Sequence, residues 1–229
     1  MKTFEQIIDS NAAAIRKVVD FNPTKDELLL LDFTSNNKGL TDEILDNTAL
    51  FSDFIDEKLQ AQGARYGIGG YDEHRTIYSR SNHFDTEKEP RRLHLGVDIW
   101  GPIGTPVYNF YDARVHSFAN NNNFGDYGAT IILSYEIGGF TFHALYGHLS
   151  AASLQDLEPG QLISAGSKFA EFGQKEENGF WPPHLHFQII TDMGTYKGDF
   201  PGVCSIQDQE YYLFVCPDPD LILRVTSCE

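Results

Sequence analysis

Residues 93–99 read Leu-His-Leu-Gly-Val-Asp-Ile, an alternation that is typical of a β-strand. Side chains two positions apart share a face, so His94, Gly96 and Asp98 lie together and the aliphatic residues face the other way. In a straight strand, positions four apart are ~13 Å from each other, too far for both side chains to reach one metal ion at about 2 Å. We therefore expect a bend, which costs least at Gly96. Alone, this segment fits a surface histidine and a surface aspartate better than it fits a metal site.

A second candidate strand, residues 184–190, reads His-Leu-His-Phe-Gln-Ile-Ile. It places His184, His186 and Gln188 on one face and aliphatic or aromatic residues on the other. The two histidines are ~6.6 Å apart along such a strand, so one can bind a metal while the other stands at the substrate side. An H-x-H pair is weak evidence by itself, but two histidines opposite an apolar face indicate a polar cleft.

A third strand, over residues 140–149, supplies another histidine. Alternation puts Tyr146 and His148 on the same face, so both are expected to project into the cleft. Trp181, just before the H-x-H pair, either walls the substrate or belongs to the core. One histidine and one aspartate from the first strand plus one histidine from the last would leave a fourth metal position open for water. That is the catalytic kind of zinc site, in which zinc acidifies the water and polarises a carbonyl.

The order and spacing of these motifs resemble the lysostaphin/LytM-type metallopeptidases, the endopeptidases of bacterial wall turnover. The resemblance spans about residues 80–190 and rests on His94-x-x-x-Asp98, Tyr146-x-His148-Leu149-Ser150, Glu158-Pro159-Gly160-Gln161 and His184-Leu185-His186-Phe187. It implies a β-sheet fold and one zinc ion per chain, held by His94, Asp98 and His186. It also implies that His148 and His184 act as general base or transition-state donor. We expect Tyr146 and Trp181 to contact the substrate.

The function predicted from this resemblance is a zinc-dependent endopeptidase that hydrolyses amide bonds in peptides, either peptidoglycan-type or glycine-rich cross-links. One alternative is a non-catalytic zinc-containing binding or regulatory module of the same fold, with the N-terminal helices or residues 65–85 covering the metal. Another is a metal hydrolase that uses the same ligands on an ester. Residues 174–181 replace the small Gly/Ser/Thr-rich loop that usually precedes the H-x-H pair in this family, which changes the rim of the cleft.

The sequence pattern changes near residue 62. Before it, a capping box at Thr3 and apolar spacing predict a helix to about Asp20, followed by a short strand over 28–33 and a helix over 42–62 that ends at Gly63. After it, short alternating runs rich in glycine and β-branched residues predict strands, with a Gly138-Gly139 hairpin turn. We therefore expect a mainly β protein: a helical N-terminal extension (1–62) and an antiparallel sheet or sandwich that forms the metallopeptidase domain (63–229). The clearest predicted strands are 93–99, 107–111, 129–136, 140–147, 168–172 and 184–190.

Composition limits the partners. Thirty-three acidic residues against 17 lysines and arginines give a net charge of −16, which disfavours nucleic acid. No run approaches the ~20 apolar residues of a membrane span, and residues 1–8 do not resemble a secretory signal. The odd set Cys204, Cys216 and Cys228 suits reduced thiols. These features favour the cytoplasm, unless a leader was removed or export uses another route. A peptide is the expected partner, and the sequence sets no oligomeric state.

Overall fold

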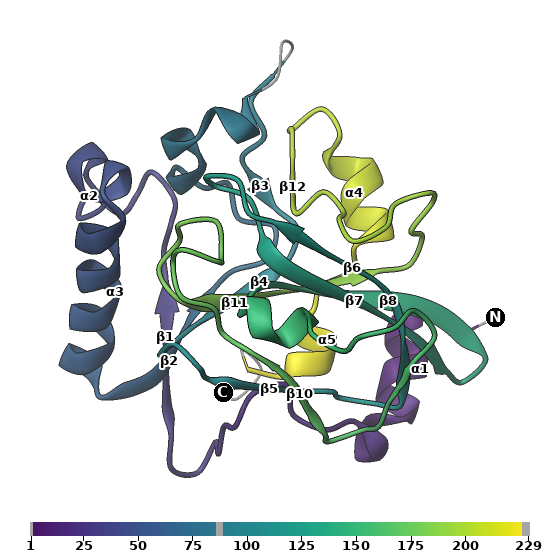
Figure 1. Ribbon diagram of the computed structural model, residues 1–229. Coiled ribbons are helices and arrows are strands. Elements are labelled where there is room, and N and C mark those ends of the chain that lie inside the picture. Colours follow the sequence, from purple (N-terminus) through teal and green to yellow (C-terminus); the bar gives the residue numbers. More distant parts are fainter. Residues whose placement is uncertain (1, 86–88, 226–229) are drawn as a thin grey trace.

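A computed structural model describes residues 2–85 and 89–225, and its centre is an eight-stranded sheet (Figure 1). The strand order is β1-β2-β4-β11-β8-β7-β6-β9, and only β1 and β2 run parallel. The strands are β1 (Glu27–Leu31), β2 (Ala64–Gly69), β4 (Val97–Trp100), β6 (Ala113–Asn121), β7 (Gly128–Ile137), β8 (Phe140–Leu149), β9 (Leu162–Ile163) and β11 (His184–Ile190). Two short antiparallel pairs accompany it: β5 (Pro106–Tyr108) with β10 (Lys168–Glu171), and β3 (Leu93–His94) with β12 (Val203–Cys204). The predicted mainly β, largely antiparallel fold is confirmed.

The hairpin between β7 and β8 forms where the glycine pair predicted it. Gly138 and Gly139 have φ angles of 59° and 80°, which only glycine adopts without strain. Two consecutive residues with positive φ match the twist that a two-residue hairpin needs. The turn sets the register in which Ile137 pairs with Phe140, and this register extends to the pair of Ile131 with Tyr146, beyond which it shifts.

The sheet is covered on both faces. One face packs Phe142 and Phe187 against Val107 of β5 and Ala170 of β10, together with helices α1 (Phe4–Ser10) and α5 (Asp220–Leu223). The opposite face packs Ile132, Leu145 and Ile190 against Val215 of α4 (Gln209–Val215). Burial on two faces explains why β11 is apolar at every position that does not face the site.

The first predicted helix is shorter than expected. Helix α1 ends at Ser10, because the side chains of Ser10 and Asn11 bond back to the carbonyls of Gln6 and Ile7. A 3₁₀ turn (Ala12–Ala14) follows, and the chain then runs extended, with a bridge between Val19 and Val107. The apolar residues that suggested further helix therefore line the edge of β5.

The second predicted helix is divided in two. Helix α2 (Asp42–Asp46) and helix α3 (Thr48–Gln62) are separated by Asn47, whose side chain accepts from the first amides of α3. Gly63 ends α3 in the left-handed conformation (φ 63°), as predicted. Short 3₁₀ turns lie at Ile77–Arg80, Asn82–Phe84 and Ala151–Leu154.

The first 62 residues share cores with the rest of the chain. Strand β1 extends the main sheet beside β2, and α3 lies along that edge (Figure 1). Ile8 and Val19 belong to the main core, while Phe33 and Phe51 pack on Trp100 of β4. The N-terminal extension thus contains helices and one strand. A domain boundary at residue 62, with residues 63–229 folding without the extension, stays a prediction.

Two further expectations concern cysteines and membranes. Cys204 and Cys216 are buried free thiols, and Cys228 lies outside the described residues. Over residues 2–85 and 89–225, no helix combines the length and the apolar character needed to cross a bilayer.

Candidate metal centre and active site

Three predicted ligands meet at the point where the first motif strand breaks. His94 ends β3, Asp98 lies in β4 and His186 lies in β11, and these strands belong to two different sheets. The expected bend is therefore present between His94 and Asp98, with Gly96 inside it. The His94 Nε2, Asp98 Oδ1 and His186 Nδ1 atoms are 3.0 to 3.3 Å from one another. All three residues are buried.

This triangle has the size of a metal site. Ligands at about 2.0 Å from a tetrahedral zinc ion are roughly 3.3 Å apart, close to the distances found here. Among the described residues, these three form a set whose ligand atoms all lie within 4.8 Å of one another. Two imidazoles and one carboxylate are ligands that zinc prefers, whereas magnesium and calcium prefer all-oxygen shells.

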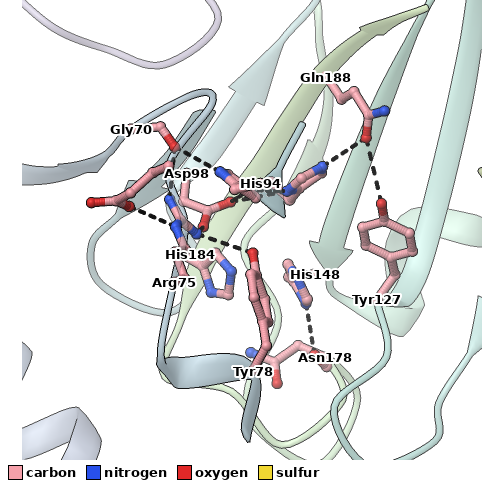
Figure 2. A network of polar contacts seen from close by, with 12 residues as sticks. Gly70, Arg75, Tyr78, His94, Asp98, Tyr127, His148, Asn178, His184 and Gln188 are labelled. Carbon is pink, nitrogen blue, oxygen red and sulfur yellow. Dashed lines mark hydrogen bonds and ion pairs between the residues drawn. The ribbon is translucent and has the colours of Figure 1, made fainter. Parts of the chain in front are cut away.

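In both histidines of the triangle, the ring nitrogen that faces away from it contacts an oxygen acceptor, as Figure 2 shows for His94. His94 Nδ1 lies 2.8 Å from the Gly70 carbonyl oxygen, and His186 Nε2 lies 3.0 Å from Gln188 Oε1. Gln188 is oriented in turn because its Nε2 donates to the Pro201 carbonyl at 3.1 Å. With those nitrogens donating, His94 Nε2 and His186 Nδ1 keep free lone pairs, the arrangement that metal-ligating histidines usually show.

The third ligand, Asp98, is held by Arg75. The fully buried guanidinium of Arg75 donates from Nη1 to Asp98 Oδ2, which leaves Oδ1 facing the two histidines. Burial opposes the ionisation of Asp98, but the neighbouring His94 and Arg75 outweigh it and hold the pKa of that carboxyl well below its usual value. Asp98 is therefore an anion near neutral pH, as a ligand must be.

The two proposed catalytic histidines lie side by side next to the triangle. Their ring centroids are 4.1 Å apart. His148 Nδ1 lies 2.8 Å from the Asn178 carbonyl oxygen, and His184 Nδ1 lies 2.7 Å from that of Pro182. Each ring therefore keeps its Nε2 for the cavity, which both residues line. Burial lowers the pKa of His184 to about 4 and that of His148 well below its usual value, so both are neutral at pH 7.

The side-chain alternation assumed for residues 140–149 fails at its end. His148 has a φ of 60°, a left-handed conformation that is uncommon outside glycine, and this turns its side chain to the site. Tyr146 faces the other way: it pairs with Phe187, is completely buried, and its hydroxyl lies 2.6 Å from that of Tyr135. The expected place of Tyr146 in the cleft is therefore wrong, because it belongs to the core face.

A cavity of about 280 Å³ opens beside these groups. Asp98, His148, His184 and His186 line one end, with Trp181 on the wall and its ring 6.3 Å from that of His148. The other lining residues are Ile77, Tyr78, His83, Phe84, Arg91, Trp100, Gly125, Asp126, Tyr127, Tyr196, Asp199, Phe200, Pro201, Gly202 and Val203. Trp181 thus lies where a substrate contact was expected, and residues 77–84 cover part of the site.

Sequence reasoning missed the groups that support the site. Gln188 was visible as the third polar residue of the alternating strand, although no role followed from that position. Arg75, Tyr78 and Gly70 carried no signal, because they lie in a segment without periodicity. Their contribution depends on tertiary contacts to Asp98 and His94.

The protein has a β-sheet domain with a buried His-Asp-His triangle and two neighbouring histidines. This combination makes it a candidate metallohydrolase. Residues 92–197 match the model of peptidase family M23, which confirms the resemblance of this segment to the lysostaphin/LytM-type enzymes.

Two curated relatives and one solved structure show the extent of this similarity. The peptidoglycan DD-endopeptidase ShyA of Vibrio cholerae is 29% identical over 153 residues, covering 62% of this chain and 32% of that protein. An L-Ala--D-Glu endopeptidase of Bacillus subtilis is 29% identical over 128 residues, covering 53% of this chain and 37% of that protein. The structure of lysostaphin from Staphylococcus simulans is 23% identical, with a TM-score of 0.43, over 71% of this chain and 52% of that one. The chain spans about a third of the length of the two curated relatives.

The expected cytoplasmic location is contradicted by these relatives. The Vibrio cholerae protein is by name a peptidoglycan endopeptidase, and peptidoglycan lies outside the cytoplasmic membrane. The inference drawn from residues 1–8 and from the cysteines is therefore wrong.

Proposed function

We propose that this protein is a zinc-dependent endopeptidase that hydrolyses amide bonds in peptidoglycan-type peptides. One observation carries the proposal: three ligand atoms lie 3.0 to 3.3 Å apart, and two of these ligands, Asp98 and His186, line a cavity together with two neutral histidines. The family match and the two endopeptidase relatives support the same reaction class. Glycine-rich cross-links are a second substrate of the same chemistry.

The donor set fits zinc. His94, Asp98 and His186 would hold one ion per chain, since their ligand atoms are deprotonated and their outer atoms are already bonded. Zinc, when bound, supplies Lewis acidity that acidifies a water molecule and polarises the scissile carbonyl.

The chain's own residues supply proton transfer and charge stabilisation. His148 and His184 point unprotonated Nε2 atoms into the cavity, so either can accept a proton at that atom during attack. Once protonated, the same nitrogen donates to the developing oxyanion or returns the proton to the leaving amine. Their backbone carbonyl partners fix both rings, and stacking on Trp100 at 3.9 Å fixes His184 further.

The cavity wall favours a peptide over a small ester. Trp181, Tyr127 and Phe200 offer apolar surface next to the ligands, and about 280 Å³ accommodates a few residues of an extended chain. Arg91, Asp126 and Asp199 also line the cavity, so charged groups of both signs are available to bind the polar ends of a peptide.

A panel of substrates tests the proposal. Purified cross-linked wall fragments, D-residue peptides and glycyl peptides are incubated with the protein, and the products are identified by mass spectrometry. We expect cleavage of one amide bond class, loss of turnover after chelation and recovery on adding zinc. No cleavage of any member by the zinc-loaded protein would contradict the proposal.

A non-catalytic zinc-containing module is the second candidate. It is favoured by the cover that residues 77–84 place over the cavity and by the deep burial of all three ligands. Such a module would bind wall fragments with zinc present but release no product, and the same panel separates the two functions.

A further inference from the structure

The guanidinium of Arg75 connects two of the three candidate metal ligands. Its Nη1 donates to Asp98 Oδ2, and its Nη2 donates at 3.0 Å to the Gly70 carbonyl. That same carbonyl accepts from His94 Nδ1 at 2.8 Å. One side chain therefore fixes Asp98 directly and His94 through a shared acceptor, as Figure 2 shows.

Two further donors of Arg75 are also occupied. Nε donates to Glu73 Oε2 at 2.7 Å, and Nη1 lies 3.2 Å from the Tyr78 hydroxyl. Arg75 is fully buried, and its two carboxylate partners are largely buried too. A planar guanidinium with several fixed partners holds a direction that a flexible ammonium would not.

The N-terminal segment contacts Arg75 and its neighbours through Phe33. The ring of Phe33 lies 5.2 Å from the Arg75 guanidinium carbon, and the Phe33 amide donates to Glu73 Oε1 at 3.2 Å. The Thr76 amide donates to the Phe33 carbonyl at 3.0 Å, so the backbone after Arg75 and the side chain of Glu73 are both bonded to Phe33. Phe33 is completely buried.

We infer that Arg75 is a positioning residue of the metal centre and that Phe33, from the N-terminal segment, holds Arg75 in place. The inference rests on the proposed metal site. Both residues lie outside the segment 92–197 that matches the peptidase family, so this support is built by the preceding part of the chain. The N-terminal segment thus orients the site instead of inhibiting it.

The test is the zinc dissociation constant of full-length variants, measured by competition with a chromophoric chelator. Arg75→Met keeps the length but removes the charge and donors, and we expect zinc binding about 10 to 100 times weaker than in the parent protein. Arg75→Lys keeps the charge but lacks the planar guanidinium. Its zinc dissociation constant should therefore lie between those of the parent protein and Arg75→Met. Phe33→Leu keeps an apolar side chain and should weaken binding a few-fold.

Arg65→Met is the matched control, because Arg65 forms ion pairs with Asp20 and Asp26 and a ring contact with Tyr66, and none of these residues belongs to the metal centre. It should bind zinc like the parent. Near-UV circular dichroism of each metal-free variant establishes that it is folded at the temperature of the titration. If Arg75→Met does not fold, Arg75→Lys and Phe33→Leu carry the test.

The outcomes separate this inference from the proposed function. If the parent binds zinc and the folded Arg75 and Phe33 variants bind it equally well, the positioning role is wrong and the metal site stands. If these variants only melt at lower temperature, with unchanged zinc affinity, Arg75 is structural and the inference is overturned. If the parent takes up no zinc, both are overturned.

Discussion

The rings of His148 and His184 lie 4.1 Å apart, and each binds a backbone carbonyl through Nδ1. This relationship distinguishes them from His186, whose Nδ1 faces Asp98 and His94. Three neighbouring histidines therefore have two different environments, and their variants should fail differently.

His186→Ala should remove zinc, whereas His184→Ala and His148→Ala should retain it. Loss of one of three protein ligands weakens the site, while loss of a general acid or base lowers turnover ~100 to 10,000-fold. Metal content by plasma mass spectrometry and kcat on the best substrate provide the comparison. Zinc retained in His186→Ala and lost in His184→Ala would reverse the two roles.

Gly96→Ala should damage the site although it replaces no ligand. A Cβ there would lie 2.6 Å from Cε1 of His186 and 2.8 Å from the Phe187 carbonyl oxygen, and the backbone atom cannot move easily. We expect a loss of about 1 to 3 kcal/mol in the free energy of unfolding, together with weaker zinc binding.

Gly70→Ala is the control for that variant. A Cβ at Gly70 meets nothing nearer than Glu73 Cβ at 3.9 Å, although the residue is in the same network. Urea unfolding of both proteins measures the difference. If the two variants are equally stable, a side chain at position 96 fits beside His186 and the expected clash is wrong.

The metal-free protein should lose stability as the pH falls below about 6.5. Burial lowers the pKa of His94 to about 3 and that of His184 to about 4, whereas both titrate near 6.5 in the unfolded chain. As the pH falls, the histidines are therefore protonated in the unfolded state before they are protonated in the folded state. The stability that they contribute is fully present above about pH 6.5 and falls toward pH 4. Each group contributes about 1.4 kcal/mol per pH unit within this window. Denaturant midpoints that stay constant from pH 7 to pH 5 would contradict the burial of neutral histidines.

Residues 63–229 should fold on their own but with lower stability and weaker zinc binding than the whole chain. The fragment keeps every candidate ligand, yet it loses β1 and the packing of Phe33 and Phe51 on Trp100. Near-UV circular dichroism and thermal unfolding provide the readout. An insoluble fragment without tertiary structure would show that the predicted boundary at residue 62 is wrong.

The strands were predictable because they follow local rules, and the candidate ligands came from the family resemblance. Alternation in residues 184–190 marks a strand with one polar face, and Gly138-Gly139 marks a hairpin. Tyr146 was misplaced because alternation assumes regular backbone, and the left-handed residue His148 reverses its own side chain. Arg75 could not be found, since its importance comes from contacts to Asp98, 23 positions away, and to the N-terminal segment.

The central claim is that His94, Asp98 and His186 bind one zinc ion. Crystals of protein purified with zinc, measured on both sides of the zinc absorption edge, test it most directly. The account predicts one zinc-specific anomalous peak per chain, about 2 Å from His94 Nε2, Asp98 Oδ1 and His186 Nδ1. A map without such a peak at these atoms, or with the zinc bound elsewhere in the chain, would contradict it.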